Sequence, residues 1–162
     1  MYLLDANVLM DASRRYYSAK LAPAFWQWLE AQHQAGTLAS IHAVRQEIDD
    51  GKEGHLTDWA KKLPPSFWIK PTQPSVVAMG TLTNWTMLPK HAYSPAARQE
   101  FLKEADYFLV AEALGGSHVV VTFEGSHPTA VKRVYIPDVC DGVGVTYERP
   151  FRVYEHRGLC LS

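Results

Sequence analysis

The chain has 162 residues, of which 47% are hydrophobic, 20% charged and 12% aromatic. This length suits one compact domain with a core of its own and is too short for two ordinary domains, and the composition excludes a disordered chain. The 16 basic and 17 acidic side chains give a net charge of −1, which excludes a global basic field, so any contact with nucleic acid must depend on local patches.

Two features predict a soluble cytoplasmic protein. The cysteines, Cys140 and Cys160, have no C-x-x-C or other framework spacing, which favours a reducing compartment. Asp5 interrupts the N-terminal apolar run before it reaches signal-peptide length. No other apolar run approaches the roughly 20 residues of a membrane span, so we expect no contact with a membrane.

Short apolar runs alternate with helical stretches along the first half of the chain. The pattern predicts strands at residues 2–4 and 37–41 and helices at residues 8–17, 24–35, 43–50 and 56–63. Pro23 suits a first helical turn, and Gly36 and Gly51 suit helix ends. The proline-rich stretch at residues 66–74 predicts a crossing over the surface.

The second half continues the alternation. It predicts a helix at residues 75–88, one long helix at residues 95–114 stopped by Gly115 and Gly116, a strong strand at residues 118–123, a short strand at residues 133–136 and a turn at residues 137–138. The sequence beyond that turn gives no clear assignment. Strands separated by helices favour a three-layer α/β/α sandwich with a central, mainly parallel sheet, formed by a single domain over residues 1–162.

Acidic residues follow two of the expected strands. Asp5 ends the first strand, and Glu124 ends the strand at residues 118–123. Ligands of open parallel sheets bind outside the carboxyl ends of the strands. If the two strands are neighbours, we expect both carboxylates to face one cleft.

Two further acids, Glu47 and Asp106, lie on expected helices near apolar faces. Glu104 is two residues from Asp106 and therefore on the opposite side of a continuous helix, so we expect Asp106 to face inward and Glu104 to be solvated. Converging carboxylates repel one another, and a divalent cation removes the conflict. Oxygen donors favour Mg²⁺ or Mn²⁺, which activate water for attack on phosphate.

Each acid also has a purely structural interpretation. Asp5 could cap a helix, Glu124 could belong to a turn before Gly125, and Glu47 and Asp106 could be solvated helix residues. The joint pattern of four acids favours the metal site.

Polar and basic neighbours extend this hypothesis. We expect the metal ligands to be oriented by hydrogen bonds from three residues, Asn7, Ser40 and Thr122. Charge combined with rings that can stack on unpaired bases predicts an RNA contact at four consecutive residues, Arg14, Arg15, Tyr16 and Tyr17. The seven histidines lack zinc-site spacing, and Cys140 suits apolar packing.

The combined motifs resemble those of the PIN-domain nucleases. The shared segments are D-x-N at residues 5–7, S-x6-E at residues 40–47, A-D-x2-L-V-A-x-A at residues 105–113 and V-V-T-x-E at residues 120–124. The chain is still more similar to a branch of the PIN-like group described as a domain of unknown function. That similarity adds L-L-D-x-N-V at residues 3–8, F-W-x-W-L at residues 25–29 and I-P-D-V-C at residues 136–140.

The resemblance implies a metal-dependent endoribonuclease that hydrolyses phosphodiester bonds of RNA and acts as the toxin of a type II toxin–antitoxin pair. It implies that four acids are both catalytic residues and ligands of Mg²⁺ or Mn²⁺: Asp5, Glu47, Asp106 and Glu124. Its partners would be RNA and an antitoxin protein. Many PIN domains have Asp where this chain has Glu124.

Two alternatives and one question of assembly stay open. The first alternative is a non-catalytic binding module with the same fold. The second is a metal-dependent phosphatase, although the D-x-D pair that such enzymes commonly use is absent because position 7 is Asn. The sequence also leaves a homodimer open.

Overall fold

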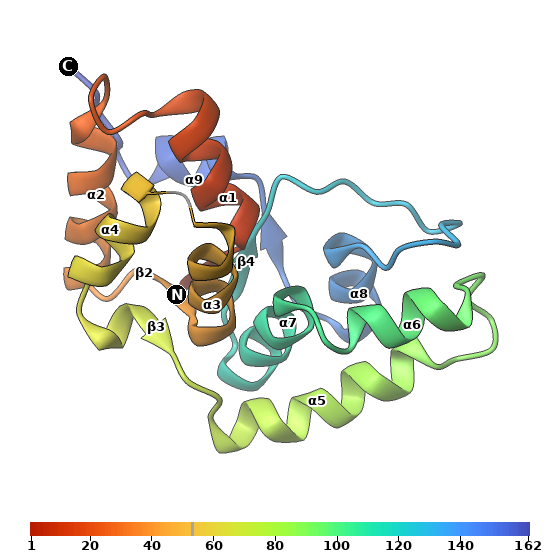
Figure 1. Cartoon of the computed structure of the whole chain (residues 1–162). Helices are drawn as coiled ribbons and strands as arrows, with labels where there is room; N and C mark the ends of the chain where they lie inside the picture. The colour runs from red at the N-terminus through yellow and green to blue at the C-terminus, as the bar shows by residue number, and fades with distance from the viewer. Residues whose placement is uncertain (53) are drawn as a thin grey trace.

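The computed structural model describes residues 1–52 and 54–162, and in these residues five strands form one sheet (Figure 1). The strands are β1 (Tyr2–Leu4), β2 (Leu38–Ile41), β3 (Trp68–Ile69), β4 (Val119–Val121) and β5 (Tyr147–Glu148). Their order is β3-β2-β1-β4-β5, and every pairing is parallel. This confirms the predicted three-layer α/β/α sandwich with a parallel sheet.

The helices begin and end mostly where sequence signals place them. They are α1 (Ala6–Asp11), continued by the π-helix η1 (Ala12–Tyr16), then α2 (Pro23–Gln34), α3 (His42–Gly51), α4 (Gly54–Lys62), the 3₁₀ turn η2 (Pro65–Phe67), α5 (Gln73–Thr86), α6 (Pro95–Phe101), α7 (Ala105–Gly116), α8 (Ile136–Val143) and α9 (Pro150–His156). Proline lies in the first turn of several of these helices, where it sacrifices no hydrogen bond. Among the described residues, no helix is both long and apolar enough to cross a membrane.

The sheet order places a topological switch point beside β1. The chain proceeds from β1 outward to β2 and β3, then returns to the other side of β1 as β4 and continues to β5. Leu4 pairs with Val121, and the backbone N–H of Asp5 donates to the carbonyl O of Val121 at 3.0 Å. The residues that follow β1 and β4 therefore leave the sheet side by side, at the edge where open parallel sheets bind ligands.

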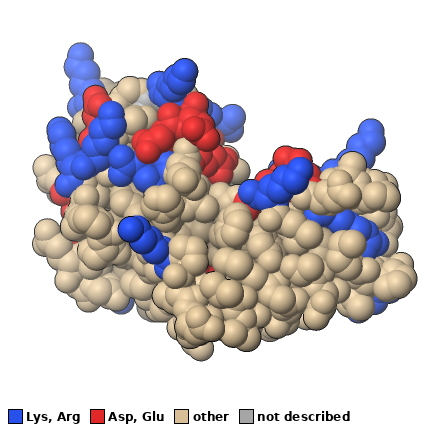
Figure 2. Space-filling view, turned by 60° about the horizontal axis from the view of Figure 1, so that its bottom comes forward, with Lys and Arg blue, Asp and Glu red and all other residues tan. Residues whose placement is uncertain are grey.

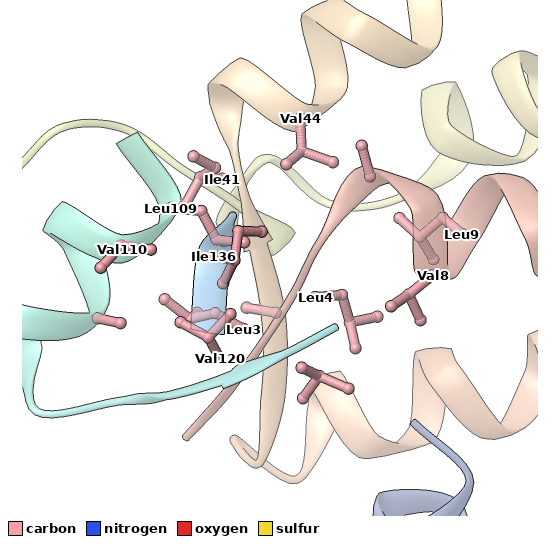
Figure 3. Packing of buried hydrophobic residues seen from close by; sticks show 14 of the residues in the cluster. Leu3, Leu4, Val8, Leu9, Ile41, Val44, Leu109, Val110, Val120 and Ile136 are labelled. Atoms are coloured by element: carbon pink, nitrogen blue, oxygen red, sulfur yellow. The ribbon is translucent and has the colours of Figure 1, made fainter. Parts of the chain in front are cut away.

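Buried apolar side chains cover both faces of the sheet. Leu3 and Leu4 are fully buried, and alternation along β1 sends them to opposite faces. Figure 3 shows Leu109 of α7 on one side of β1 and Val8 and Leu9 of α1 on the other. Burial on both faces explains why the strands are continuous apolar runs.

The chain departs from the predicted elements in three places outside the site. Residues 66–74 were predicted to cross the surface, but β3 lies there, and Phe67 and Trp68 are buried. Residues 133–136 were predicted as a strand with a turn at 137–138, but they lead into α8, and the edge strand is β5. β3 and β5, the two edge strands, have two residues each. Strands this short show no alternation of apolar and polar residues, so the sequence pattern could not predict them. Gly51 lies inside α3, and Lys52 adopts the left-handed conformation that ends it.

The predicted long helix at residues 95–114 is two helices. It breaks at residues 102–104, between α6 and α7, and no Gly or Pro marks the break. Gly115 and Gly116 were predicted to stop the helix but belong to α7, and Ser117 ends it in the left-handed conformation. A Cβ on Gly115 would lie 2.6 Å from the backbone of Pro74. Only glycine permits this close approach of the start of α5 to α7.

Candidate functional site

Two carboxylates are buried at the switch point. Asp5 follows β1 and is 1% exposed, and Asp106 lies in the first turn of α7 and is 9% exposed. Although Asp5 precedes α1, its side chain makes no capping hydrogen bond to that helix. The helix-cap interpretation of Asp5 therefore does not explain its burial.

Thr122 connects the ends of β1 and β4. Its buried hydroxyl donates to Asp5 Oδ2 at 3.0 Å and accepts from the backbone N–H of Glu124 at 3.1 Å. One side chain thus fixes the orientation of Asp5 and the direction in which the chain continues into Glu124. This arrangement is the orienting contact that we expected of Thr122.

Glu124 is turned toward the loop that precedes α8. Its Oε2 accepts from the backbone N–H of Ile136 at 2.8 Å, and its Oε1 forms an ion pair with Arg133. Arg133 also lies 3.9 Å from Asp106 Oδ2, and its guanidinium is 4.8 Å from the ring centroid of Tyr135. Arg133 is thus the cation that joins Glu124 to Asp106, and about half of its side chain is exposed.

The acids perturb one another's protonation. Burial, followed by the charge of Glu124, raises the pKa of Asp5 to about 7. Burial, followed by the charge of Asp5, raises the pKa of Asp106 to about 9. Burial also raises the pKa of Glu47 and of Glu104, and the charge of Arg133 opposes both shifts. Metal-free protein therefore keeps protons on its most buried acids at pH values where ordinary carboxyl groups are ionised.

Four acids, Glu47, Asp50, Glu104 and Asp106, line an open pocket of about 400 Å³, whereas Asp5 and Glu124 lie outside its lining. Its lining comprises Asn7, Ala43, Gln46, Glu47, Asp50, Lys103, Glu104, Ala105, Asp106, Phe108 and Arg133. Figure 2 shows acidic side chains gathered on both sides of a depression, with basic side chains next to them. Helices α3 and α7 thus bring acids from distant parts of the sequence to one pocket.

The position of Glu104 corrects the sequence analysis. It was expected to be solvated on the far side of a continuous helix, but it precedes α7 with extended backbone angles, is partly buried and lines the pocket. Because α6 and α7 are separate helices, the phase argument for Glu104 does not apply. Asp50 also lines the pocket and was not predicted.

A family model described as a domain of unknown function, DUF4411, matches residues 2–160. The chain belongs to the DUF4411 family. Comparisons with curated proteins and with solved structures found no match. The description of the family specifies no reaction, so its members' chemistry must be inferred from side chains such as those around this pocket.

The donor chemistry of this DUF4411 site fits a hard divalent cation. The hydroxyl of Thr122 donates to Asp5, and the half-exposed Arg133 lies 3.9 Å from Asp106. A bound cation would favour the ionised form of these buried acids, which otherwise keep their protons. Among the described residues, no three His, Cys, Asp or Glu side chains lie close enough together to hold a metal ion as they stand. Glu124 would have to turn from Arg133 to complete such a group.

Asn7 and Ser40, the other two residues of the DUF4411 chain that were predicted to orient the metal ligands, lie in different surroundings. Asn7 is exposed and lines the pocket. Ser40 is buried, and its hydroxyl donates to the carbonyl O of Leu4 at 2.7 Å. Ser40 therefore holds the end of β1 and acts on Asp5 only through the backbone, not by the direct hydrogen bond that we expected.

The predicted RNA-contact segment lies at the end of η1, with Tyr17 directly after its last residue. Arg15 lies 3.6 Å from Asp11 in an exposed ion pair, and Arg14 is exposed. The ring of Tyr17 stacks on that of Phe25 at 4.2 Å between centroids, so it is packed against the core. Tyr16 is 47% exposed. Of the two tyrosines, Tyr16 is the more exposed.

Proposed function

We propose that this protein is a divalent-metal-dependent endoribonuclease of the PIN type, the toxin of a type II toxin–antitoxin pair. The observation that carries the proposal is the buried pair of Asp5 and Asp106 at the switch point of a parallel sheet, of which Asp106 lines a pocket rimmed by further acids. The resemblance of the motifs to PIN-domain nucleases supports the same conclusion. The role as a toxin rests on that resemblance alone.

Each side chain has a role that follows from its position. Asp5 and Asp106 would hold Mg²⁺ or Mn²⁺, with Glu47 and Glu124 reaching it from the rim. The cation would supply an acidified water and would neutralise charge that develops on the phosphate. Thr122 keeps Asp5 in one orientation, which reduces the reorganisation needed when the ligands assemble.

Basic side chains at the pocket provide places for the substrate's phosphates. Lys103 and Arg133 line the pocket together with the acids. When a cation takes over the charge of Glu124 and Asp106, the half-exposed guanidinium of Arg133 can pair with a phosphate oxygen. Because the whole chain has a net charge of −1, we expect modest RNA affinity that falls with salt at a shallow slope.

The chemistry predicts the ends of the products. Hydrolysis by water needs no ribose hydroxyl as nucleophile, so the products should have 5′-phosphate and 3′-hydroxyl ends. Mass spectrometry of cleaved single-stranded RNA, with Mg²⁺ or Mn²⁺ present, identifies them. A substrate with 2′-deoxyribose at the scissile position should still be cut.

A 2′,3′-cyclic phosphate would exclude this mechanism. A protein that binds RNA but cleaves none of it with either metal would fit the non-catalytic module instead. Release of phosphate from monoesters without cleavage of RNA would favour the phosphatase. Relief of toxicity by the product of an adjacent gene tests the antitoxin separately.

The half-buried position of Glu104 predicts a measurable but secondary contribution. Glu104→Gln should lower the cleavage rate by roughly 10- to 100-fold, the range for loss of a partner outside the ligand shell. Asp106→Asn should cost more, because Asp106 is the more buried acid and borders Asp5. Single-turnover rates at saturating Mn²⁺ compare the two variants. Equal losses would place Glu104 among the ligands, and no loss with Glu104→Gln would remove it from the site.

A further inference from the structure

Two aromatic side chains stand out from the rest of the molecule. Tyr16 and Phe151 are 47% and 45% exposed, and no other Phe, Trp or Tyr side chain of the described residues is exposed to this extent. They come from η1 and α9, near opposite ends of the chain, yet their ring centroids are 5.3 Å apart and the rings meet edge to face. The fold brings its two exposed aromatic rings together.

A third ring links this pair to the candidate site. The ring of Phe123 lies 5.7 Å from that of Tyr16 and 5.3 Å from that of Phe151, measured between centroids. Phe123 directly precedes Glu124 at the carboxyl end of β4. We call Tyr16, Phe123 and Phe151 the aromatic platform. It lies at the same edge of the sheet as the buried acids.

Arginines surround the platform. Arg149 donates to the carbonyl O of Phe123 and, at 3.0 Å, to that of Glu124, so its guanidinium lies at the junction between the platform and the site. Arg15 and Arg152 adjoin Tyr16 and Phe151 in the sequence, Arg14 lies two residues before Tyr16, and all three arginines are exposed. Arg15 and Arg152 have only loose ion pairs, to Asp11 at 3.6 Å and to Glu148 at 4.0 Å. Three exposed arginines of a nearly neutral chain thus lie within two residues of the exposed rings in the sequence.

We propose that the aromatic platform binds unpaired nucleobases of the strand whose phosphodiester enters the acidic pocket. Exposed rings offer π faces on which any base can stack, and the neighbouring guanidinium groups suit the phosphates between the bases. Bases inside a duplex already stack on their neighbours and present only their edges. The platform therefore selects RNA that is single-stranded next to the cleavage site. This inference rests on the proposed function for the identity of the ligand.

Binding measured without cleavage tests the platform. The probe is a single-stranded RNA oligonucleotide that carries 2-aminopurine, whose fluorescence is quenched when it stacks, mixed with wild-type protein in EDTA. The test variants are Tyr16→Leu, Phe151→Leu and the double variant, because leucine preserves apolar packing but has no π face. The control is Val77→Ala, an exposed apolar residue of α5. Melting temperatures are recorded for every protein.

We expect each leucine variant to bind the single strand more weakly, with a Kd raised by roughly 5- to 100-fold, which is the range for loss of one stacked base. The quenching of 2-aminopurine should disappear in the double variant, while Val77→Ala and the melting temperatures stay unchanged. The same sequence in a duplex should bind the wild-type protein more weakly and should not respond to the substitutions.

Two outcomes overturn the inference. One is a double variant that binds the single strand with wild-type affinity and quenching. This result would show that the rings do not bind RNA and would favour contact with a protein partner instead. The other is a wild-type protein that binds no single-stranded RNA. Because the assay needs no metal, a failed nuclease and a failed platform remain distinguishable. RNA binding that depends on the rings, without cleavage in Mg²⁺ or Mn²⁺, would reject only the nuclease.

Discussion

We expect Asp106→Asn to abolish metal-dependent cleavage and, in metal-free protein above neutral pH, to raise the melting temperature. The substitution removes a carboxylate whose ionisation is opposed by burial and by the charge of Asp5. A neutral amide of similar shape does not suffer this repulsion, so the folded state gains stability while the cation loses a ligand. The loss of activity should exceed the ~10- to 100-fold cost of removing an outer partner. The gain in melting temperature should be roughly 2–4 °C for each kcal/mol gained at this chain length.

Asp5→Asn should also abolish cleavage and raise the melting temperature. The gain in melting temperature should be smaller than for Asp106→Asn, because the hydroxyl of Thr122 loses its ionised acceptor. Asp58→Asn is the matched control, because Asp58 is an exposed acid on α4, and it should change neither quantity. Thermal unfolding in EDTA and cleavage in Mn²⁺ measure the two effects on the same preparations. An Asp106→Asn protein that is folded but less stable than wild type would contradict the predicted electrostatic repulsion. Full activity of the same protein would contradict the predicted role of Asp106 as a metal ligand.

We expect the stability of metal-free protein to fall as the pH rises from about 4 toward the raised pKa of Asp5, about 7, and that of Asp106, about 9. The pKa of each acid is raised in the folded state, so over this range the folded chain keeps protons that the unfolded chain has released. Stability then decreases with pH, the reverse of what ion-paired carboxylates with lowered pKa values produce. Melting temperatures recorded from pH 4 to pH 9 in EDTA follow the decline.

Mg²⁺ or Mn²⁺ should reverse this decline, since a cation binds the ionised carboxylates and competes with their protons. At a metal concentration about 100 times its Kd, the gain is about 2.7 kcal/mol, which corresponds to roughly 5–10 °C for a chain of this size. The shift should be larger at pH 8 than at pH 5. A shift that is absent with both metals, or that does not depend on pH, would argue against a cation site at these acids.

Much of the site could be predicted because strand ends are readable in the sequence. Asp5 and Glu124 each follow an apolar run, and a parallel sheet brings such positions to one edge. Thr122 could be assigned an orienting role for the same reason. The sequence could not show that Glu124 is turned toward Arg133 and Ile136, because that contact depends on the path of the loop before α8.

The parts that could not be predicted depend on packing between distant elements. Nothing in residues 100–104 marks the break that brings Glu104 to the pocket, since no Gly or Pro occurs there. The outward contact of Tyr16 with Phe151 depends on how η1 and α9 meet. The edge strands β3 and β5 have two residues each and carry no periodicity that distinguishes them from loops.

The hydrogen bond between Thr122 and Asp5 joins residues that are 117 positions apart, and this separation affects the protein during its own synthesis. Asp5 leaves the ribosome early, but β1 cannot pair with β4 until three quarters of the chain has been made. A nascent chain therefore carries neither the orienting hydroxyl nor Glu124 until residues 122 and 124 have been added. A protein that cuts RNA would gain a delay from this order, because its site cannot be assembled before the last quarter of the chain is being translated.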